Sequence, residues 1–452
     1  MSQRRRGRWL LWAVGLAVVA LPPLYLFLWA GGTDLRRARA ELDAADPGWR
    51  LDDLLAAQQA ALPPADQNAL VLADEVPPWG LLPAAYQEWA KAHTDHRSWL
   101  PERDLNRLPG LDSAAAVDAW RAARPALDLA RRIRHTPAGG VVVAVPDNAF
   151  DTRFVHLDTA GQVIQLLSFD AAVSAVRNDQ DRALESIRAT LNLARAVDGP
   201  FLLTAHFRLS FNGRAVRDLE RVMALTEPRA GLPELQAALL AEADAGAVAA
   251  GLRGGRAAAD REFASIEDGQ IGLRPVLAGV GGGIGPQAVV EAVRYRPYLR
   301  VDHARTLRLF TALIEVARQP PGEWTAGANA VPAPPADGKH VLSRWYHTQA
   351  TKLLQTGLHD QANLRTAAIA VACERFRQAH GRWPDTLTEL VPAYLTAVPT
   401  DPYDGQPLRL RRTADGLMVY AVGPDGVAPR KEIGFRLWDV DRRRAAPAPD
   451  AP

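Results

Sequence analysis

The stretch GRWPDTLTELVPAYLTAVPTDPYDGQPLRLRRTADGLMVYAVGPDG, residues 381–426, decides how the carboxy-terminal part of this chain folds. Gly381 is well placed to end a preceding helix, because glycine tolerates the left-handed backbone conformation that closes many helices. Pro384 and Asp385 then begin a short predicted helix over residues 385–395. Leu387, Leu390 and Tyr394 of this segment can fold back on the helix that precedes it.

The second half of the stretch predicts a turn followed by a β-hairpin. Pro402 fixes one backbone angle and Gly405 can adopt a positive one, which is typical of a turn. Residues 408–423 then alternate on either side of Asp415-Gly416, a pair that commonly joins two antiparallel strands. We therefore expect a two-stranded hairpin.

A long amphipathic helix is predicted over residues 349–381, directly before this stretch. Lone Cys373 lies within it and is interpreted as a packing residue, since a single cysteine cannot form an internal disulfide. The residues at helical spacing are Leu364, Ala367, Ala368, Val371, Ala372, Arg375 and Phe376. A helix covered by a hairpin sheet would form a compact two-layer α+β unit.

These segments resemble the globular part of the major pseudopilin of type II secretion systems. In that family a long helix is followed by G-x-[YW]-P-x-x-L-x-x-L, a D-P-[WY] turn, and a Tyr-containing strand that ends in G-x-D-G. The resemblance covers roughly residues 360–440 and implies a module used in assembly. The whole chain also resembles uncharacterised membrane-anchored proteins of planctomycete-type bacteria. The matching residues are Gly381, Trp383, Pro384, Leu387 and Leu390, then Asp401, Pro402, Tyr403, Gly405 and Pro407, then Tyr420, Gly423, Asp425 and Gly426.

The resemblance also implies a calcium site in the final loop, with Asp425, Glu432 and Asp439 as candidate ligands. Calcium takes six to eight oxygen ligands, and carboxylates are prominent among them. Arg430 and Lys431 stand between these acidic residues, so the sequence favours a plain turn at the end of the hairpin. No other cofactor is expected.

The amino terminus predicts a membrane anchor. Residues 9–30 contain no charged side chain, and ~20 apolar residues span the hydrocarbon layer of a bilayer as a helix. Residues 1–8 carry four arginines, so the positive-inside rule places them in the cytoplasm. The lipid bilayer is therefore the expected partner of residues 9–30, and the chain beyond residue 32 is expected outside the cytoplasm.

A cleaved signal peptide is the alternative to this anchor. Signal peptides have an apolar region of ~7–15 residues followed by an A-x-A-like site. The apolar segment here is longer, and only AGG follows it. We expect an uncleaved, single-pass anchor in the bacterial inner membrane.

Helical periodicity continues through residues 33–318. Asp34 is a plausible N-cap, Asn178-Asp179 break a pair of helices, and a long helix is expected over 287–318. Residues 139–150 fit either a short strand or an apolar loop. Antiparallel helices joined by short turns bury their apolar faces against each other, which predicts an irregular helical array without a repeat period.

The predicted fold is thus mainly α, with an anchor, an irregular helical array and a small α+β module. Its predicted parts are a basic cytoplasmic tail 1–8, a transmembrane anchor 9–30, an extracytoplasmic helical domain 33–318, a Pro/Gly/Ala-rich linker 319–340, a pseudopilin-like module 341–442 and a disordered tail 443–452.

No catalytic motif emerges from the sequence. His93, Asp95 and His96 lie close together, but their spacing does not place both imidazoles on one helical face, so surface positions are expected. Residues 269–288 are rich in glycine without the lysine of a phosphate-binding loop, which indicates a plain loop. The arginines at 253, 256 and 261 are expected on a solvated face or in ion pairs with Asp260 and Glu262.

Charge excludes one class of partner. The 53 basic and 51 acidic residues nearly cancel, and only residues 1–8 concentrate positive charge, so no nucleic-acid partner is expected. We expect a membrane-tethered extracytoplasmic structural or interaction protein with envelope protein partners, in a secretion or envelope assembly. An exported hydrolase with a site assembled from distant residues is the alternative.

Overall fold

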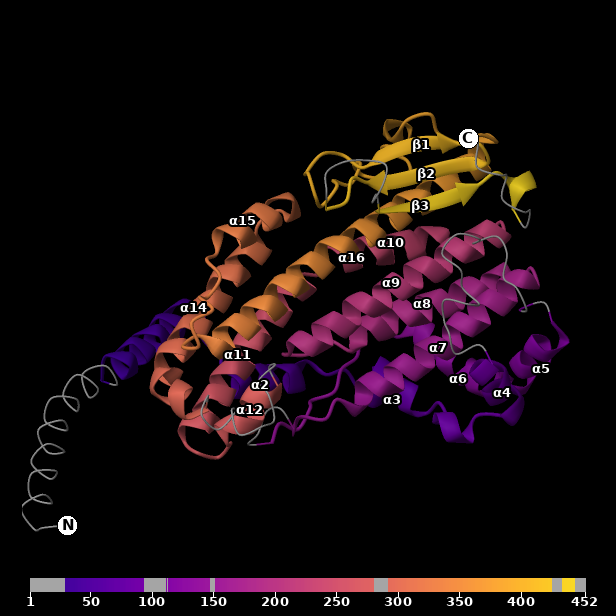
Figure 1. Cartoon of the computed structure of the whole chain (residues 1–452). Helices are drawn as coiled ribbons and strands as arrows, with labels where there is room; N and C mark the ends of the chain where they lie inside the picture. The colour runs from indigo at the N-terminus through magenta and orange to yellow at the C-terminus, as the bar shows by residue number, and fades with distance from the viewer. Residues whose placement is uncertain are drawn as a thin grey trace, which may run out of the picture.

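The computed structural model describes residues 29–92, 111, 113–146, 151–279, 292–424 and 433–443. Within these residues the protein is mainly helical, with a small antiparallel sheet near the carboxy terminus (Figure 1). The predicted fold class is confirmed in this coarser form. Residues 1–28, which include most of the predicted anchor, and residues 444–452 of the predicted tail lie outside the described residues.

The long elements are α-helices, and short 3-10 turns connect several of them. The α-helices are 29–45, α2 (Leu51–Ala61), α3 (Ala69–Asp74), α4 (Ala84–Ala92), α5 (Ala114–Ala122), α6 (Arg124–Arg131), α7 (Val155–Val176), α8 (Gln180–Ala196), α9 (Leu202–Leu225), α10 (Leu232–Ala243), α11 (Ala247–Glu267), α12 (Leu273–Gly279), α14 (Leu299–Arg318), α15 (Trp324–Ala330) and α16 (Val341–His380). The strands are β1 (Arg409–Thr413), β2 (Gly416–Ala421) and β3 (Ile433–Trp438).

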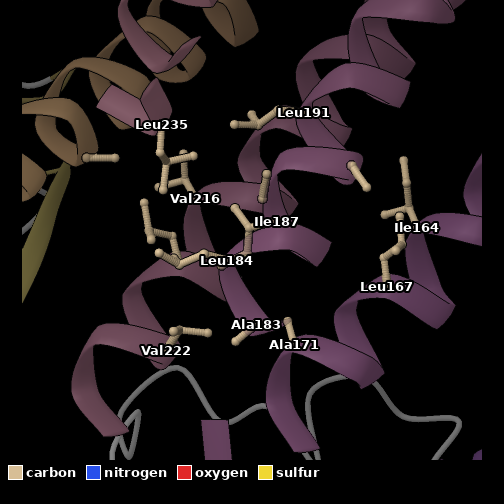
Figure 2. Close-up of a cluster of buried hydrophobic side chains, with 14 of the residues drawn as sticks. Ile164, Leu167, Ala171, Ala183, Leu184, Ile187, Leu191, Val216, Val222 and Leu235 are labelled. Carbon is tan, nitrogen blue, oxygen red and sulfur yellow. The ribbon is translucent and has the colours of Figure 1, made fainter. Parts of the chain in front are cut away.

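Helices α7 to α10 form the centre of the array, and their aliphatic side chains meet between them (Figure 2). Ile164 of α7, Ile187 of α8 and Val216 of α9 belong to this buried cluster. The break predicted between α7 and α8 is confirmed. Asn178 adopts the left-handed conformation (φ 62°), and the side chain of Asp179 caps α8 by accepting from the backbone N–H of Arg182.

Helix α16 begins at Val341, earlier than predicted, and ends at the predicted Gly381, whose φ is 71°. It packs against α9, α10 and α14 on one side and against the sheet on the other. This explains why buried residues occur around most of its circumference. The two-layer unit predicted from the sequence is therefore extended by a third layer of array helices.

The sheet has the order β1-β2-β3, and both pairs are antiparallel. The predicted hairpin is present, with Thr413 opposite Gly416 and residues 414–415 forming the loop. Strand β3 was not predicted. It pairs with β2, and its outer edge is held by α9, where Glu220 accepts from the backbone N–H of Arg436 at 2.8 Å.

One predicted helix is shorter than expected. In the segment 385–395 only Leu387–Leu390 is helical, as a 3-10 turn that begins with a Thr386–Glu389 capping box. Of the predicted helix 287–318, residues 292–318 are helical, as a first turn, the 3-10 turn Arg296–Tyr298 and α14, and residues 287–291 lie outside the described residues. The open choice at 139–150 resolves to a loop over residues 139–146, the first part of which lies beside α3.

Within the described residues, Leu232–Glu267 is one stretch long and apolar enough to cross a membrane by composition. It consists of α10 and α11, which are separated at residues 244–246, where Gly246 has a φ of 69°. Half of its most apolar window is buried inside the protein, and both helices pack on other helices. We therefore assign it to the core.

The predicted linker 319–340 contains α15, whose first residue, Trp324, is buried. Residues on the two sides of this segment share one hydrophobic core. Leu364 and Val371 of α16 belong to the same cluster as Leu235 of α10 and Leu167 of α7. The array and the carboxy-terminal module therefore pack as one body.

Residues 29–45, which we call the stalk helix, pack along α14. Leu35, Ala38 and Leu42 form a small buried cluster with Ala304 and Leu307. The prediction that Asp34 caps this helix is wrong, because the helix already includes residue 29 and Asp34 instead pairs with Arg308 at 2.7 Å. Figure 1 shows the stalk helix and the sheet at opposite ends of the molecule.

Candidate functional site

One of the three predicted calcium ligands lies within the described residues. Asp425 and Glu432 lie outside them. Asp439 accepts a hydrogen bond from the indole N–H of Trp383 at 2.6 Å, so one of its carboxylate oxygens is used inside the protein. Calcium binding by this loop stays a prediction.

The other candidates from the sequence fall into two groups. His93, Asp95 and His96 lie outside the described residues, as does the glycine-rich segment from residue 280 to 288. The prediction of a plain loop over 269–288 is wrong for its first half, because Leu273–Gly279 forms the helix α12. Cys373 is fully buried in α16, and this burial raises the pKa of its thiol, as expected of a packing residue.

The arginines of α11 form ion pairs, but with partners other than those predicted. Arg253 and Arg256 both bind Asp46, and Arg261 binds Asp52. The predicted partners Asp260 and Glu262 face other elements. Neighbouring residues on a helix point in different directions, so each meets whichever element packs on its own side.

His303 lies at the centre of a buried polar cluster that the sequence did not reveal. Its imidazole is fully buried, with Nε2 2.8 Å from Asp260 and Nδ1 3.1 Å from Glu267. It stacks on Phe263 with ring centroids 4.5 Å apart. Both ring nitrogens are therefore already engaged within the protein, which suits a structural role.

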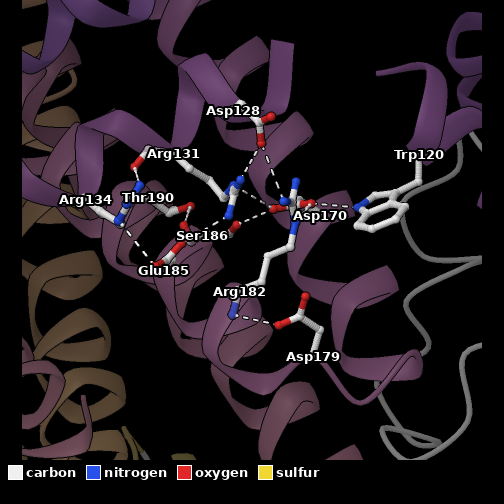
Figure 3. Close-up of polar contacts among 10 residues, drawn as sticks. All are labelled: Trp120, Asp128, Arg131, Arg134, Asp170, Asp179, Arg182, Glu185, Ser186 and Thr190. Carbon is white, nitrogen blue, oxygen red and sulfur yellow. Dashed lines mark hydrogen bonds and ion pairs between the residues drawn. The ribbon is translucent and has the colours of Figure 1, made fainter. Parts of the chain in front are cut away.

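Asp170 organises another buried polar cluster, between α5, α6, α7 and α8 (Figure 3). It accepts hydrogen bonds from Trp120 Nε1 at 2.7 Å, Arg182 Nε at 2.9 Å and Ser186 Oγ at 2.7 Å. Arg131 lies 3.5 Å from the same carboxylate. A buried carboxylate with this many donors is satisfied, so we interpret the cluster as holding the helices in register.

A small cavity offers a different arrangement. Its volume is about 200 Å³, and it lies where α9, α10, α11, α14, α15 and α16 meet. We call it the junction cavity. Its polar lining includes Glu242 and Asp244 at the end of α10, and Asp360, Gln361 and Arg365 on α16. Trp324 forms part of its apolar wall.

Asp360 is the least satisfied acid of the junction cavity. Its side chain is 4% exposed, and only its Oδ2 accepts a hydrogen bond, from Asn212 Nδ2 at 3.1 Å. Its Oδ1 has no hydrogen-bond partner within the described structure, and neither does Oε1 of the adjacent Gln361. Burial raises the pKa of Asp360 well above its usual range, and the nearby charge of Glu242 adds to the effect.

Glu242 has the opposite surroundings. Arg208 binds it through two nitrogens, Nε at 2.6 Å and Nη2 at 3.0 Å, and Arg195 Nε lies at 2.9 Å. Asn212 donates to it as well, at 3.1 Å. Although burial opposes ionisation, these donors lower the pKa of Glu242, which is therefore a fixed anion.

Asp244 and Arg365 also line the junction cavity and bind each other. The Asp244 side chain is largely exposed and pairs with Arg365 Nη2 at 3.1 Å, while Nη1 of the same guanidinium donates to the backbone oxygen of Thr400 at 2.9 Å. In the lining of the cavity, Glu242 and Asp244 are already paired with arginines, and the two oxygens without a partner, Asp360 Oδ1 and Gln361 Oε1, are buried.

The sequence contained one signal for this site. Asp360 falls three residues after Gly357 and four before Leu364, so it stands in the apolar row of α16. A lone acid in an apolar row indicates a buried polar contact, but its partners on α9 and α10 are far away in the sequence.

No family model, curated protein or solved structure matches this chain. The assignment of function therefore rests on the sequence and on the geometry above.

Proposed function

We propose that this chain is a membrane-tethered extracytoplasmic structural or interaction protein, which takes part in an envelope or secretion assembly. Residues 9–30 would anchor it in the inner membrane, and the helical body with its pseudopilin-like module would meet envelope protein partners.

The observation that carries the proposal is the docking of the stalk helix on the body. This helix, residues 29–45, shares its first two described residues with the apolar segment 9–30. Besides its apolar contacts with α14, it forms two ion pairs with the body, Asp34–Arg308 and Arg39–Asp260, the second at 2.9 Å. Asp46, directly after it, binds Arg253 and Arg256 of α11. A body fixed to its tether in this way suits a protein that holds a partner-binding surface at a fixed position relative to the membrane.

The alternative of an exported hydrolase finds less support in the junction cavity. Hydrolysis by acid–base chemistry needs a base that can accept a proton from water. Glu242 is held as an anion by two arginines and an amide, which lower its pKa and occupy its oxygens, so it does not suit the role of a base. Asp360, whose pKa burial raises, has no histidine or second free carboxylate among its described hydrogen-bond partners.

Two experiments test the proposal. Reporters fused to the carboxy terminus should be active when they require an extracytoplasmic location and inactive when they require the cytosol. The reverse pattern would overturn the predicted topology.

A photo-crosslinking amino acid at Arg412, an exposed position on β1, should then capture envelope proteins from intact cells. The same amino acid at Glu234, exposed on α10, is the control position. Equal capture at both positions, or none at Arg412, would count against a binding role for the sheet.

A further inference from the structure

We propose that a cavity at the stalk end of the body binds the phosphate headgroup of an anionic phospholipid, with Arg296 and Arg300 as the side chains that contact the phosphate. The inference rests on the proposed function, because the cavity reaches a headgroup only if residues 9–30 lie in the bilayer. It adds a class of lipid to the partners of the folded body.

The cavity lies where the predicted anchor ends. Its volume is about 440 Å³, and we call it the stalk-end cavity. Gly31, the first residue after the apolar segment 9–30, forms part of its lining. The other lining residues come from the end of α11 and from the segment that leads into α14, and they are Glu267, Val293, Arg296, Pro297, Leu299 and Arg300.

The stalk helix and α14 run side by side in the same direction (Figure 1). A Cβ on Gly31 would lie 3.0 Å from Val301 Cγ2, and further along both helices Asp34 pairs with Arg308. Helix α14 therefore begins at the end of the molecule where the stalk helix meets the predicted anchor. The polar headgroups of a bilayer begin where its hydrocarbon layer ends, so the stalk-end cavity would lie at their level.

Arg296 and Arg300 are exposed side chains that can reach a guest. Among the described residues no carboxylate pairs with Arg296, whereas Arg300 Nε lies 3.1 Å from Glu267. Arg300 Nη1 and Arg36 Nη1 lie 3.5 and 3.6 Å from one point, the position that a Cβ of Gly32 would take. Two guanidinium groups therefore converge beside the cavity, and phosphate oxygens accept strong hydrogen bonds from such groups.

The nearby acids do not cancel this positive charge. Glu267 lies between Arg300 Nε and His303 Nδ1, at 3.1 Å from each. Asp268, which follows it, is exposed. Other acids of this region are bound within the body: Asp34 by Arg308, Asp260 by Arg39 and His303, and Asp302 by Tyr295 and Ser343.

Four exposed arginines lie in the cavity lining or next to it. Even if Glu267 and Asp268 each offset one of them, two positive charges remain. Arginines close to a membrane surface attract anionic lipids, so an anionic guest fits this region better than a neutral or cationic one. The four are Arg36, Arg294, Arg296 and Arg300.

Apolar surface next to the arginines favours a lipid over free phosphate. Val293 in the lining is 70% exposed, and Trp29, two residues before Gly31, is 58% exposed. Tryptophan is enriched where a membrane meets water. A lipid can bury these side chains while its phosphate meets the arginines, whereas inorganic phosphate leaves them in water.

The test is native mass spectrometry of the full chain in a neutral detergent, with phosphatidylglycerol and phosphatidylcholine supplied in equal amounts. We expect phosphatidylglycerol to be retained roughly 10- to 30-fold more strongly, because it brings a net negative charge to two arginines. Excess inorganic phosphate should not displace it. Equal retention of the two lipids, or displacement by inorganic phosphate, would overturn the proposal.

Variants locate the site. Arg296→Gln and Arg300→Gln should each weaken the retention of phosphatidylglycerol roughly 5-fold. Arg318→Gln is the matched control, because Arg318 is about as exposed as Arg300 and also pairs with a glutamate, but lies at the other end of α14. Unchanged retention in both Arg296→Gln and Arg300→Gln, or equal loss in Arg318→Gln, would contradict the assignment.

Alkaline extraction of cell membranes tests the tether separately. A chain that resists extraction but shows no preference for phosphatidylglycerol supports the proposed tether and contradicts this inference. A chain that alkali releases contradicts the tether itself, and this inference with it.

Discussion

Glu242 and Asp360 share the amide of Asn212, yet their pKa values shift in opposite directions. Burial disfavours the charged form of both. Glu242 overcomes it because Arg208 and Arg195 lie within hydrogen-bond distance, whereas Asp360 has only the amide. The number of donors, and not the depth of burial, decides which buried acid is ionised.

Glu262 is another buried acid with few donors, so the pH dependence of stability can test whether its pKa is raised. It is 4% exposed, and burial raises its pKa to about 8, although the hydroxyl of Tyr346 donates to it at 2.5 Å. The folded state therefore holds a proton that the unfolded chain has released above its usual pKa of 4.5. As pH rises from 4.5 to 8, this group should reduce the free energy of unfolding by about 1 kcal/mol per pH unit.

Glu262→Gln removes this titration. Urea unfolding of the full chain in detergent gives the free energy of unfolding at several pH values. Between pH 5 and 8 this free energy should rise for the variant relative to the wild type. Glu315→Gln, at an exposed ion pair, is the control and should follow the wild type. Parallel curves for Glu262→Gln and the wild type would contradict the raised pKa.

Helix α11 shows how close packing of elements depends on a missing side chain. A Cβ placed on Gly254 would lie 2.3 Å from the backbone carbon of Pro200, so α11 and the segment before α9 can approach only because glycine stands there. Gly254→Ala should destabilise the protein by about 1–3 kcal/mol, because the backbone of Pro200 has to move.

Gly161→Ala in α7 is the matched control for this substitution. A Cβ there would meet nothing closer than a ring carbon of Phe211 at 3.9 Å. Since alanine favours helix over glycine, this change should leave stability equal or raise it by up to about 1 kcal/mol. Thermal unfolding of both variants gives the comparison, and equal effects would show that the close approach does not matter.

Elements with strong local signals could be predicted, and those that depend on distant partners could not. The α7–α8 break was predictable because Asn178 and Asp179 suit a left-handed residue and an N-cap. The hairpin followed from alternation around Asp415-Gly416. Strand β3 was missed because its apolar residues, Ile433, Phe435 and Leu437, alternate over only six residues. The contacts that stabilise it, pairing with β2 and a hydrogen bond to α9, come from residues distant in the sequence.

The candidate site was less predictable than the fold. Asp360 is visible as an acid in an apolar row, but Asn212, Glu242 and Trp324 reach it from three other elements. No local pattern links residues so far apart. The partners of Arg253 and Arg261 were misjudged for the same reason, because proximity in sequence favoured Asp260 and Glu262 over Asp46 and Asp52.

For the molecule as a whole, the docking of the stalk helix should depend on Asp46 more than on Asp34. Arg256, which binds Asp46, has a side chain that is 2% exposed, whereas Asp34 and Arg308 are both more than 40% exposed. Asp46→Ala leaves a buried guanidinium without its carboxylate and should cost about 2–4 kcal/mol. Asp34→Ala should cost at most about 1 kcal/mol.

Denaturant unfolding measures both costs, and the rate of protease cleavage near residues 46–50 reports release of the stalk helix. Similar costs for the two variants would contradict this ranking.

The shared core predicts that the carboxy-terminal module does not fold alone. Arg375 binds Gln236, Arg377 binds Glu227, and the buried side chain of Arg443 binds the Thr226 carbonyl, so polar contacts add to the apolar ones. Residues 341–452 expressed separately should show no cooperative thermal transition. Co-expression with residues 29–340 should restore one. A cooperative transition of the isolated segment would contradict the shared core.

Helix α16 runs for 40 residues without a break, about 60 Å at 1.5 Å per residue. If the other end of the molecule is tethered as proposed above, this long rigid helix would transmit a displacement of the sheet along the whole protein. A partner that displaced the sheet end by roughly 5 Å would tilt the whole helix by roughly 5°, given the length set by the helix rise. In the proposed tethered state, a load on the sheet would therefore change the angle between the body of the protein and the bilayer.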